Sequence, residues 1–338
     1  MAITLNRLYP GKLEHGFLSS LLHKYTSTDD RIVLGAKVGE DATVIDMGDN
    51  YLVAKTDPIT FAVDRIGHYA VHVNANDIVC MGATPKWFLA TILLPENATR
   101  QLAESIFAQI AKVCKQEGIA YCGGHTEVTI GLQRPIVVGQ MLGEADKTSL
   151  LLKKNAYVGD HIILVQSAPV EATSILATEN EELLGQHFSL EFVQKCQNLF
   201  IEPGISVRPY AALAMRTAEV HAMHDPTEGG IATAIHELAL AADTGVRIVS
   251  EKIPLLSEGK LLCDFFELDP LGCIASGSLL LAVPYQSVEP IIKAFDQAGV
   301  PASDVGKLVQ KSAGKTLVEK DIEHFLPVFE QDEIAKTF

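Results

Sequence analysis

The sequence has no stretch of about 18 uninterrupted apolar residues, and its N-terminus lacks the basic-then-apolar layout of a signal peptide. These absences argue against a membrane-spanning or exported protein, and they predict a cytoplasmic one without a membrane partner. Cysteine is sparse: the six cysteines are widely scattered and include no CxxC pair. We therefore expect reduced thiols, most of them buried as small apolar side chains, and no disulfide framework.

Basic residues are also few. Lysine and arginine total 27 against 42 aspartates and glutamates, which gives a net charge of −15, and no basic run interrupts this balance. Such a chain repels polyphosphate backbones, so we expect no nucleic-acid partner. The surplus of acid could maintain solubility, or some carboxylates could hold a divalent metal for an anionic ligand. Composition alone favours solubility.

The chain otherwise has the composition of an ordinary globular protein, with 48% apolar and 20% charged residues over 338 positions. This length suggests two domains or one large one. Runs of β-branched residues predict strands at 42–45, 51–55 and 135–141. Apolar residues at three- and four-residue spacing predict helices at 68–81 and 100–117, the latter closed by the glycine that follows it.

A break into lysine-rich and small polar residues at 145–159 indicates a domain boundary. We expect domains at 1–148 and 155–338. The second half repeats the theme of strands and helices, and together the two halves predict an α/β protein. Its predicted elements are strands at 160–166, 246–249 and 278–283, a polar helical region at 171–200, and helices at 208–217 and 231–242.

Two carboxylates flank a predicted hairpin. Asp41 stands where the chain enters one strand, and Asp57 follows Lys55 and Thr56 where the chain leaves the next. A turn at 48–50 would bring both acids to the same end of the strand pair. Hard cations such as Mg²⁺ prefer carboxylate oxygens and often share them with phosphates, so the two acids are a candidate cation site. Ordinary turn and strand-end residues are the alternative.

Polar side chains interrupt the first predicted helix. Asn74, Asn76 and Asp77 lie within an otherwise apolar run. A buried polar group without a partner costs about 1–3 kcal/mol, so these side chains need something to bind. A metal or nucleotide would satisfy them, and a hydrogen-bond network across the helix would do so equally well.

A pair of glycines marks a third candidate. Gly123 and Gly124 end an apolar segment and would let the backbone approach a ligand closely, with His125 and Thr126 as polar groups beside it. A plain turn with a hydrogen-bonded histidine is the alternative, because no second histidine lies at metal-ligand spacing.

A second pair of glycines precedes the helix predicted at 231–242. Gly229 and Gly230, which follow Asp225 and Thr227, would expose the first free N–H groups of that helix, where its dipole favours an anion. This is a candidate phosphate cradle, although the sequence GxxxxGK[ST] is absent. In the alternative interpretation, Asp225 or Thr227 simply caps the helix.

Taken in order and spacing, six segments resemble the family that joins aminoimidazole ribonucleotide synthase, thiamine-monophosphate kinase, selenophosphate synthetase and the hydrogenase maturation factor HypE. The resemblance covers essentially the whole chain. HypE looks like the nearest branch, because of HDPTEGG and the DPL stretch. The six segments are GEDATVI (39–45), KTDPIT (55–60), NANDIVCMGATP (74–85), GGHTEV (123–128), HDPTEGGIATAIHELA (224–239) and DPLGCIASG (269–277).

The resemblance implies a PurM-like two-domain fold of the α/β (α+β) class, in which the N-terminal sheet forms a barrel with a second subunit and a C-terminal α/β domain follows. It therefore implies a homodimer, with ATP near the subunit interface and Mg²⁺ held by Asp41, Asp57, and Asn76 or Asp77. The positions that it implies for ATP and Mg²⁺ binding are Asp41, Lys55, Thr56, Asp57, Asn74, Asn76, Asp77, Gly123, Gly124, His125, Thr126, Asp225, Thr227, Gly229 and Gly230.

Four departures from the HypE pattern bear on the activity. HypE ends in a cysteine that carries a carbamoyl group, whereas this chain ends at Phe338. Residues 275–277 read Ala-Ser-Gly where HypE typically has Asn-Glu-Gly. His125 replaces a usual acidic residue, with Glu127 two residues on, and Glu228 replaces a common arginine.

We do not expect the protein to dehydrate a carbamoyl group of its own. We expect it to be an ATP- and Mg²⁺-dependent enzyme. It would activate or phosphorylate an amide or hydroxyl oxygen of a small-molecule or protein-borne acceptor. Charge neutralisation and positioning by Mg²⁺ would supply most of the acceleration. The alternative is a non-catalytic ATP-binding sensor or scaffold dimer. A third possibility is a hydrogenase maturation factor whose partner supplies the missing cysteine.

Overall fold

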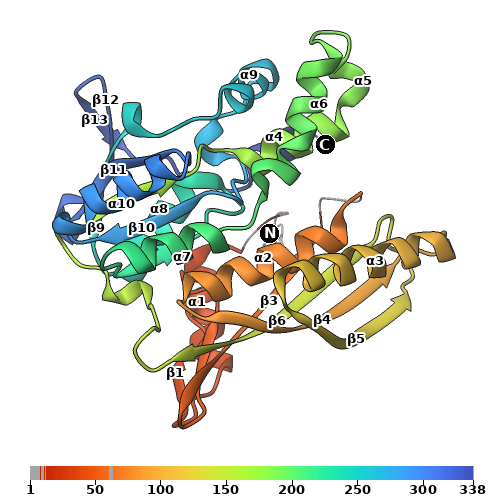
Figure 1. Cartoon of the computed structure of the whole chain (residues 1–338), viewed down its shortest axis with the longest axis horizontal. Helices are drawn as coiled ribbons and strands as arrows, with labels where there is room; N and C mark the ends of the chain where they lie inside the picture. Colours follow the sequence, from red (N-terminus) through yellow and green to blue (C-terminus); the bar gives the residue numbers. More distant parts are fainter. Residues whose placement is uncertain (1–7, 9–10, 12, 61–63, 338) are drawn as a thin grey trace, which may run out of the picture.

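The computed structural model describes residues 8, 11, 13–60 and 64–337. Within them the chain forms two β-sheets, one in each half, with helices packed between and around them (Figure 1). This is the mixed α/β architecture of two sheet-containing domains that the sequence predicts. The domain limits 1–148 and 155–338 remain a prediction.

The first sheet has six strands in the order β1-β2-β3-β6-β4-β5. All neighbours are antiparallel except β4 and β5, which are parallel and are connected through a helix. The strands are β1 (Ile32–Leu34), β2 (Thr43–Asp46), β3 (Asn50–Ile59), β4 (Thr84–Leu94), β5 (Ala120–Val128) and β6 (Ile136–Asp146). The helices of this half are α1 (His15–Tyr25), α2 (Ile66–Cys80) and α3 (Arg100–Glu117).

Helix α3 has the bounds that the sequence predicts, because local signals define both of its ends. The Thr99 hydroxyl accepts a hydrogen bond from the Leu102 N–H at 3.1 Å, and Gly118 ends the helix with a φ of +68°. Ile106 and Ile110 on its inner face are buried. The helix therefore packs one apolar side against the molecule and leaves the other in water.

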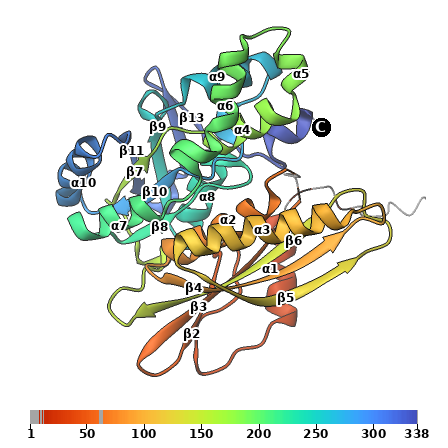
Figure 2. The same cartoon turned by 45° about the vertical axis from the view of Figure 1, so that its right-hand side comes forward.

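Helix α2 is buried along nearly its whole length because it lies between the first sheet and the elements of the second half (Figure 2). Its apolar residues share one continuous core with the first sheet and with α4 (Val170–Glu179) and α6 (Leu190–Asn198). The polar residues of α2 are thus held at the junction of the two halves.

The second sheet has seven strands in the order β13-β12-β9-β11-β7-β10-β8, antiparallel except for β9 and β12. The neighbouring strands β7 and β10 are almost entirely buried. The strands are β7 (His161–Val165), β8 (Ala222–His224), β9 (Gly245–Val249), β10 (Leu279–Val283), β11 (Ala302–Val309), β12 (Lys315–Glu319) and β13 (Ile322–Phe325). The remaining helices are α5 (Glu181–Leu184), α7 (Arg208–Thr217), α8 (Gly230–Ala241), α9 (Ser257–Phe266) and α10 (Tyr285–Gln297).

The structure corrects several predicted elements. Residues 171–200 form three helices rather than one polar helical region, and α4 is mostly buried. The glycine pair at 123–124 lies inside β5 and is not a turn. Strand β4, beside it, was not predicted, nor were α9, α10 and the last three strands.

In a single chain the described strands leave the first sheet open. Strand β5 is one of its edges, and nearly all side chains of β5 are exposed. A barrel shared with a second subunit thus remains a prediction. No helix among the described residues combines the length and apolar character needed to cross a membrane.

Candidate active site

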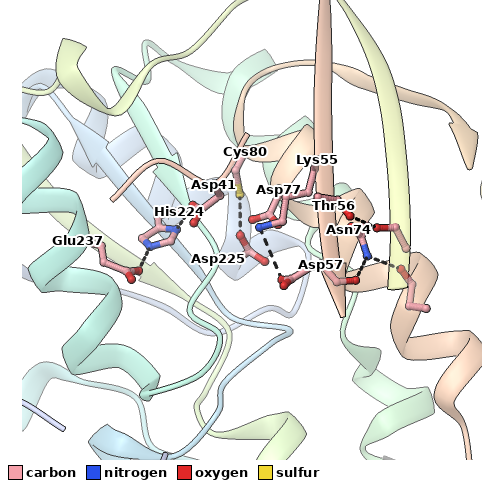
Figure 3. Close-up of polar contacts among 12 residues, drawn as sticks. Asp41, Lys55, Thr56, Asp57, Asn74, Asp77, Cys80, His224, Asp225 and Glu237 are labelled. Atoms are coloured by element: carbon pink, nitrogen blue, oxygen red, sulfur yellow. Dashed lines mark hydrogen bonds and ion pairs between the residues drawn. The ribbon is translucent and has the colours of Figure 1, made fainter. Parts of the chain in front are cut away.

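Four aspartates gather where α2 meets the second half, and we call them the acidic cluster. Asp41 precedes β2, Asp57 lies on β3, Asp77 lies on α2, and Asp225 follows β8 (Figure 3). The fold thus draws them from both sheets and from the helix between them.

Lys55 of β3 neutralises part of this cluster. Its Nζ atom lies 2.8 Å from Asp77 Oδ2 and 3.6 Å from Asp57 Oδ2. Burial opposes the charge of this lysine, but Asp77, Asp57 and Asp41 together raise its pKa well above the usual range. Lys55 is therefore a permanent cation between two carboxylates.

A second buried lysine holds Asp41. Lys153 contacts Asp41 Oδ2 and donates a hydrogen bond to the Gly39 carbonyl at 2.9 Å. His224 lies beside them: its Nδ1 atom is 3.4 Å from Asp41 Oδ2, and its Nε2 atom is 2.9 Å from Glu237 Oε2. Burial works against ionisation of Asp41, yet Lys153, His224 and Lys55 lower its pKa below the ordinary value.

The other two carboxylates of the cluster have raised pKa values. Burial, with Asp41 and Asp57 nearby, raises the pKa of Asp77 to about 6 even though Lys55 opposes it. Burial and the neighbouring Asp77 and Asp41 also raise the pKa of Asp225 well above its usual range. The Cys80 thiol donates to Asp225 Oδ1 at 3.6 Å, whereas Asp225 Oδ2 has no hydrogen-bond partner among the described residues.

Such an excess of buried negative charge favours a bound cation. Carboxylate oxygens are the ligands that Mg²⁺ prefers, and the unpartnered oxygen of Asp225 remains open to one. The donor chemistry of the acidic cluster thus fits Mg²⁺. Over the described part of the chain, no three histidine, cysteine or acidic side chains already form a metal-binding group.

Thr56 and Asn74 connect neighbouring elements beside the acidic cluster. The Thr56 hydroxyl donates to the Gly139 carbonyl at 2.9 Å, within the sheet. The Asn74 amide donates to the carbonyls of Ala70 at 2.9 Å and Asp57 at 3.3 Å, so it joins α2 to β3. Asn74 Oδ1 is buried without a partner among the described residues, and it is an acceptor that a ligand could use.

Asn76, predicted as a metal ligand, has another role here. Its Nδ2 donates to the Ile205 carbonyl at 2.8 Å, and its Oδ1 accepts from the Val207 N–H at 3.0 Å. Both ends of the amide are engaged by the backbone of the second half. In this structure Asn76 therefore joins α2 to the second half, and its role as a metal ligand stays a prediction.

The predicted residues of β5 lie away from the acidic cluster. Asp57, Gly139, Ala90 and Gly124 form one row across β3, β6, β4 and β5, so Gly124 is three strands from Asp57, a separation of roughly 14 Å. Gly123, His125 and Thr126 adjoin it on the same exposed edge, where His125 pairs with Glu127 at 3.1 Å. One chain does not bring these residues together with the aspartates.

An acid of the same chain binds one N–H at the N-terminus of α8, which the sequence predicts as a phosphate cradle. The Gly229 N–H donates to Asp332 Oδ2 at 2.7 Å, and the Gly230 N–H donates to the Thr227 carbonyl at 2.9 Å. Gly230, with a φ of +66°, could not carry a side chain, because a Cβ would lie 2.5 Å from the Leu271 carbonyl oxygen. In this structure Asp332 therefore takes one N–H at the start of α8, and a phosphate at this N-terminus stays a prediction.

The sequence analysis missed several groups around the acidic cluster. Lys153 belongs to no motif, and its contact with Asp41 joins residues 112 positions apart. His224 and Glu237 lie within a quoted motif, but nothing in their spacing distinguished them as a pair. Asp332 binds Gly229 across 103 positions.

Comparison with known proteins agrees with this architecture. Residues 39–145 match the N-terminal domain of AIR synthase related proteins, and residues 157–319 match the C-terminal domain. A Methanocaldococcus jannaschii protein named for hydrogenase expression and formation is 27% identical over 87% of this chain and 89% of its own length. The carbamoyl dehydratase HypE of Rhizobium leguminosarum is 26% identical over 88% of this chain and 84% of its own length.

Solved structures show the same fold. The hydrogenase maturation protein HypE in complex with ATP superposes with a TM-score of 0.69 at 19% identity, covering 92% of this chain and 90% of that one. The kinase ThiL complexed with AMPPCP and TMP gives a TM-score of 0.71 at 20% identity, covering 92% and 97%. This chain is a HypE-like member of the AIR synthase related family.

Proposed function

We propose that this protein is an ATP- and Mg²⁺-dependent enzyme that activates or phosphorylates an amide or hydroxyl oxygen of an acceptor. The acidic cluster with its two buried lysines is the observation that carries the proposal. The names of relatives support it: one is a carbamoyl dehydratase and another a selenide, water dikinase. The titles of two solved structures add ATP and AMPPCP as ligands of proteins with this fold.

The residues have separate parts in this proposal. Mg²⁺ bound by Asp41, Asp57 and Asp77 would neutralise the charge of the transferred phosphoryl group. Lys55 stands between two of these acids and would offer its charge to a phosphate oxygen, while Lys153 and His224 keep Asp41 ionised. Asn74, whose Oδ1 has no partner among the described residues, would orient the nucleotide from α2.

We further propose a homodimer joined through the open edge of the first sheet. Strand β5 presents its unpaired backbone groups and exposed side chains there. A second subunit would cover this edge. Gly123, Gly124, His125 and Thr126 would then serve an ATP site formed between subunits rather than within one.

Titration calorimetry with a non-hydrolysable ATP analogue tests the nucleotide site without the acceptor. We expect binding that depends on Mg²⁺, and at least a tenfold weaker affinity, about 1.4 kcal/mol, in Asp41→Asn and Asp57→Asn. The matched control is Asp49→Asn, an exposed acid in the turn between β2 and β3, which should bind as the parent does. Absence of binding with and without Mg²⁺, or unchanged binding by the two cluster variants, would refute the assignment.

One observation favours a second candidate, the non-catalytic ATP-binding sensor. Asp332 accepts the Gly229 N–H at the N-terminus of α8, so an anionic group would have to displace it to reach that donor. ADP formation stimulated by any acceptor would rule out this alternative.

A further inference from the structure

A hollow between α2 and α4 lies apart from the acidic cluster. Tyr69, in the first turn of α2, lines it on one side, and Ser174 and Thr178 of α4 line it on the other. Tyr69 precedes Asp77 by eight residues, so the two are about 12 Å apart along the axis of α2. The hollow is thus a separate place in the molecule, formed by one helix from each half of the chain.

The size of the hollow limits what it can hold. The space open to the centre of a water-sized group is about 20 Å³, which suits one or two such groups. A phosphate group, with its oxygens arranged around phosphorus, is too large for this space. Ile175 adds an apolar wall, against which a short carbon chain can pack. The hollow therefore suits a single small head group with an apolar stem.

The polar groups on the walls of the hollow offer acceptors. The Ser174 hydroxyl donates to the Gln197 carbonyl at 3.0 Å, and the Thr178 hydroxyl donates to the Ser174 carbonyl at 2.8 Å. Because each hydroxyl proton is already engaged, the remaining lone pairs of both oxygens can only accept. Asp64 and Glu179 add two carboxylates to the same walls. A ligand of this hollow must therefore bring several hydrogen-bond donors.

Tyr69 brings a buried hydroxyl without a partner to the hollow. The residue is 4% exposed, and none of the described residues forms a hydrogen bond with its hydroxyl. Burial raises the pKa of this hydroxyl, and the charges of Glu171 and Glu179 raise it further against the opposing charge of Arg65. Acids thus outnumber bases around the hydroxyl. A ligand that donates to its oxygen would satisfy it, whereas an anion would be repelled.

The charges on the walls also favour a cation. Burial, followed by the charge of Asp64, raises the pKa of Glu179, although Arg134 opposes this shift. Arg65 is the basic side chain on the walls, and its guanidinium lies over the Phe200 ring, 4.8 Å from the centroid. Two carboxylates therefore share the hollow with one guanidinium that is held by an aromatic ring. A positively charged ligand would relieve their repulsion.

We propose that the hollow between α2 and α4 binds the ammonium group of a primary alkylamine. An ammonium group is about the size of a water molecule, carries three N–H donors and no acceptor, and is positively charged. It therefore matches the volume, the acceptors and the charge of the hollow together. The ammonium group donates to the oxygens of the walls, and its carbon chain packs along Ile175. The bound amine joins the two halves, and the inference does not depend on the proposed function.

Calorimetric titration with n-butylammonium chloride at constant ionic strength tests the site. Tetramethylammonium chloride is the matched probe, because it has the same charge but no N–H donor. We expect saturable binding of one butylammonium per chain and no binding of tetramethylammonium. Tyr69→Phe and Glu179→Gln should each weaken the binding at least fivefold, since each removes one acceptor.

A second probe distinguishes the source of the amine. Nα-acetyl-lysine amide carries the same ammonium group on a peptide backbone. If it binds more tightly than butylammonium, the hollow serves a lysine side chain of a protein. If it binds more weakly, the hollow serves a free amine.

The controls separate a specific site from general attraction to an acidic surface. Glu182→Gln removes the same charge from the exposed side of α5, off the walls of the hollow, and should bind butylammonium as the parent does. Three results overturn the proposal: no binding of butylammonium by the parent, equal binding of tetramethylammonium, or full affinity in both Tyr69→Phe and Glu179→Gln. A thermal melt of each variant, and its parent-like affinity for the ATP analogue, establish that it is folded.

Discussion

At the scale of single residues, two buried carboxyl groups in the second half should make the free energy of unfolding depend on pH. Glu171 has a pKa raised to about 7 by burial, and Asp332 has one raised to about 6 for the same reason. Both lie outside the acidic cluster. Each holds its proton more tightly in the folded chain than in the unfolded one.

The pH dependence of stability follows from this difference. Between about pH 5 and 7 the folded state binds more protons than the unfolded state, so the free energy of unfolding should fall as the pH rises through that range. A shift of this size in Glu171 corresponds to about 2 kcal/mol over the window. Asp41, whose pKa is lowered, affects stability only at more acidic pH. Urea unfolding at a series of pH values measures the slope.

Glu171→Gln should reduce the fall in the free energy of unfolding between about pH 5 and 7 by about 2 kcal/mol and leave the protein more stable near pH 7 than the parent. Glu182→Gln, on the exposed surface of α5, should leave the slope unchanged. An identical pH profile for the parent and Glu171→Gln would show that the glutamate titrates as it does in the unfolded chain.

Contacts between side chains that are far apart in the sequence could not be predicted from the sequence alone. Asp41, Asp57 and Asp77 could be selected because each stands in a short motif beside a recognisable strand or helix. Their counter-charge Lys153 comes from a stretch interpreted as a boundary, 112 residues from Asp41. Likewise, the partner of Ser276 is Glu171, 105 residues earlier, in a region that was expected only to be polar and helical.

At the scale of elements, the segments with strong local signals were predicted well. Helices α3 and α7 have the predicted bounds, because amphipathic spacing and end residues define them. Strand β5 was missed since its two glycines are typical of turns. What makes it a strand is its parallel pairing with β4, a tertiary contact that propensity does not encode.

The two glycines of β5 differ sharply in what surrounds them. A Cβ on Gly124, whose φ is +142°, would lie 1.9 Å from the Ala90 carbonyl oxygen, whereas a Cβ on Gly123 would lie 3.8 Å from its nearest neighbour, the Leu89 side chain. We expect Gly124→Ala to lower the free energy of unfolding by about 2–3 kcal/mol, because β4 and β5 must separate to accommodate it.

Gly123→Ala is the control on the same strand: its φ of +158° also disfavours a side chain, but the nearest atom to its Cβ position is Leu89 Cδ2 at 3.8 Å, so it should cost less than Gly124→Ala. Chemical denaturation of both variants gives the comparison. Equal stability of the two would contradict the close approach of β5 to β4.

At the scale of the whole molecule, the open edge of the first sheet predicts the state of assembly. Val128 and Ile130, at the end of β5 and just beyond it, are 59% and 85% exposed. Apolar side chains beside an unpaired strand edge favour association. We expect a dimer by light scattering coupled to gel filtration, and a shift to monomer in Val128→Asp and Ile130→Asp.

The other sheet provides the control for this experiment. Ile322 lies on the edge strand β13 and is 60% exposed, much like Val128. Ile322→Asp should leave the dimer intact. A monomeric parent, or a dimer disrupted only by Ile322→Asp, would show that β5 is not the interface.

The hydrogen bonds of Asn76 determine which substitutions are tolerated at position 76 and in the loop that it contacts. One side chain holds two backbone groups, the Ile205 carbonyl and the Val207 N–H, so nothing in the contact depends on which side chains stand at 205 and 207. Position 76 must keep a group that donates with one atom and accepts with the other, at the right length, and only asparagine does so there. Selection should therefore keep asparagine at position 76. The side chains at 205 and 207 should be free to vary as long as they remain apolar enough for the surrounding core.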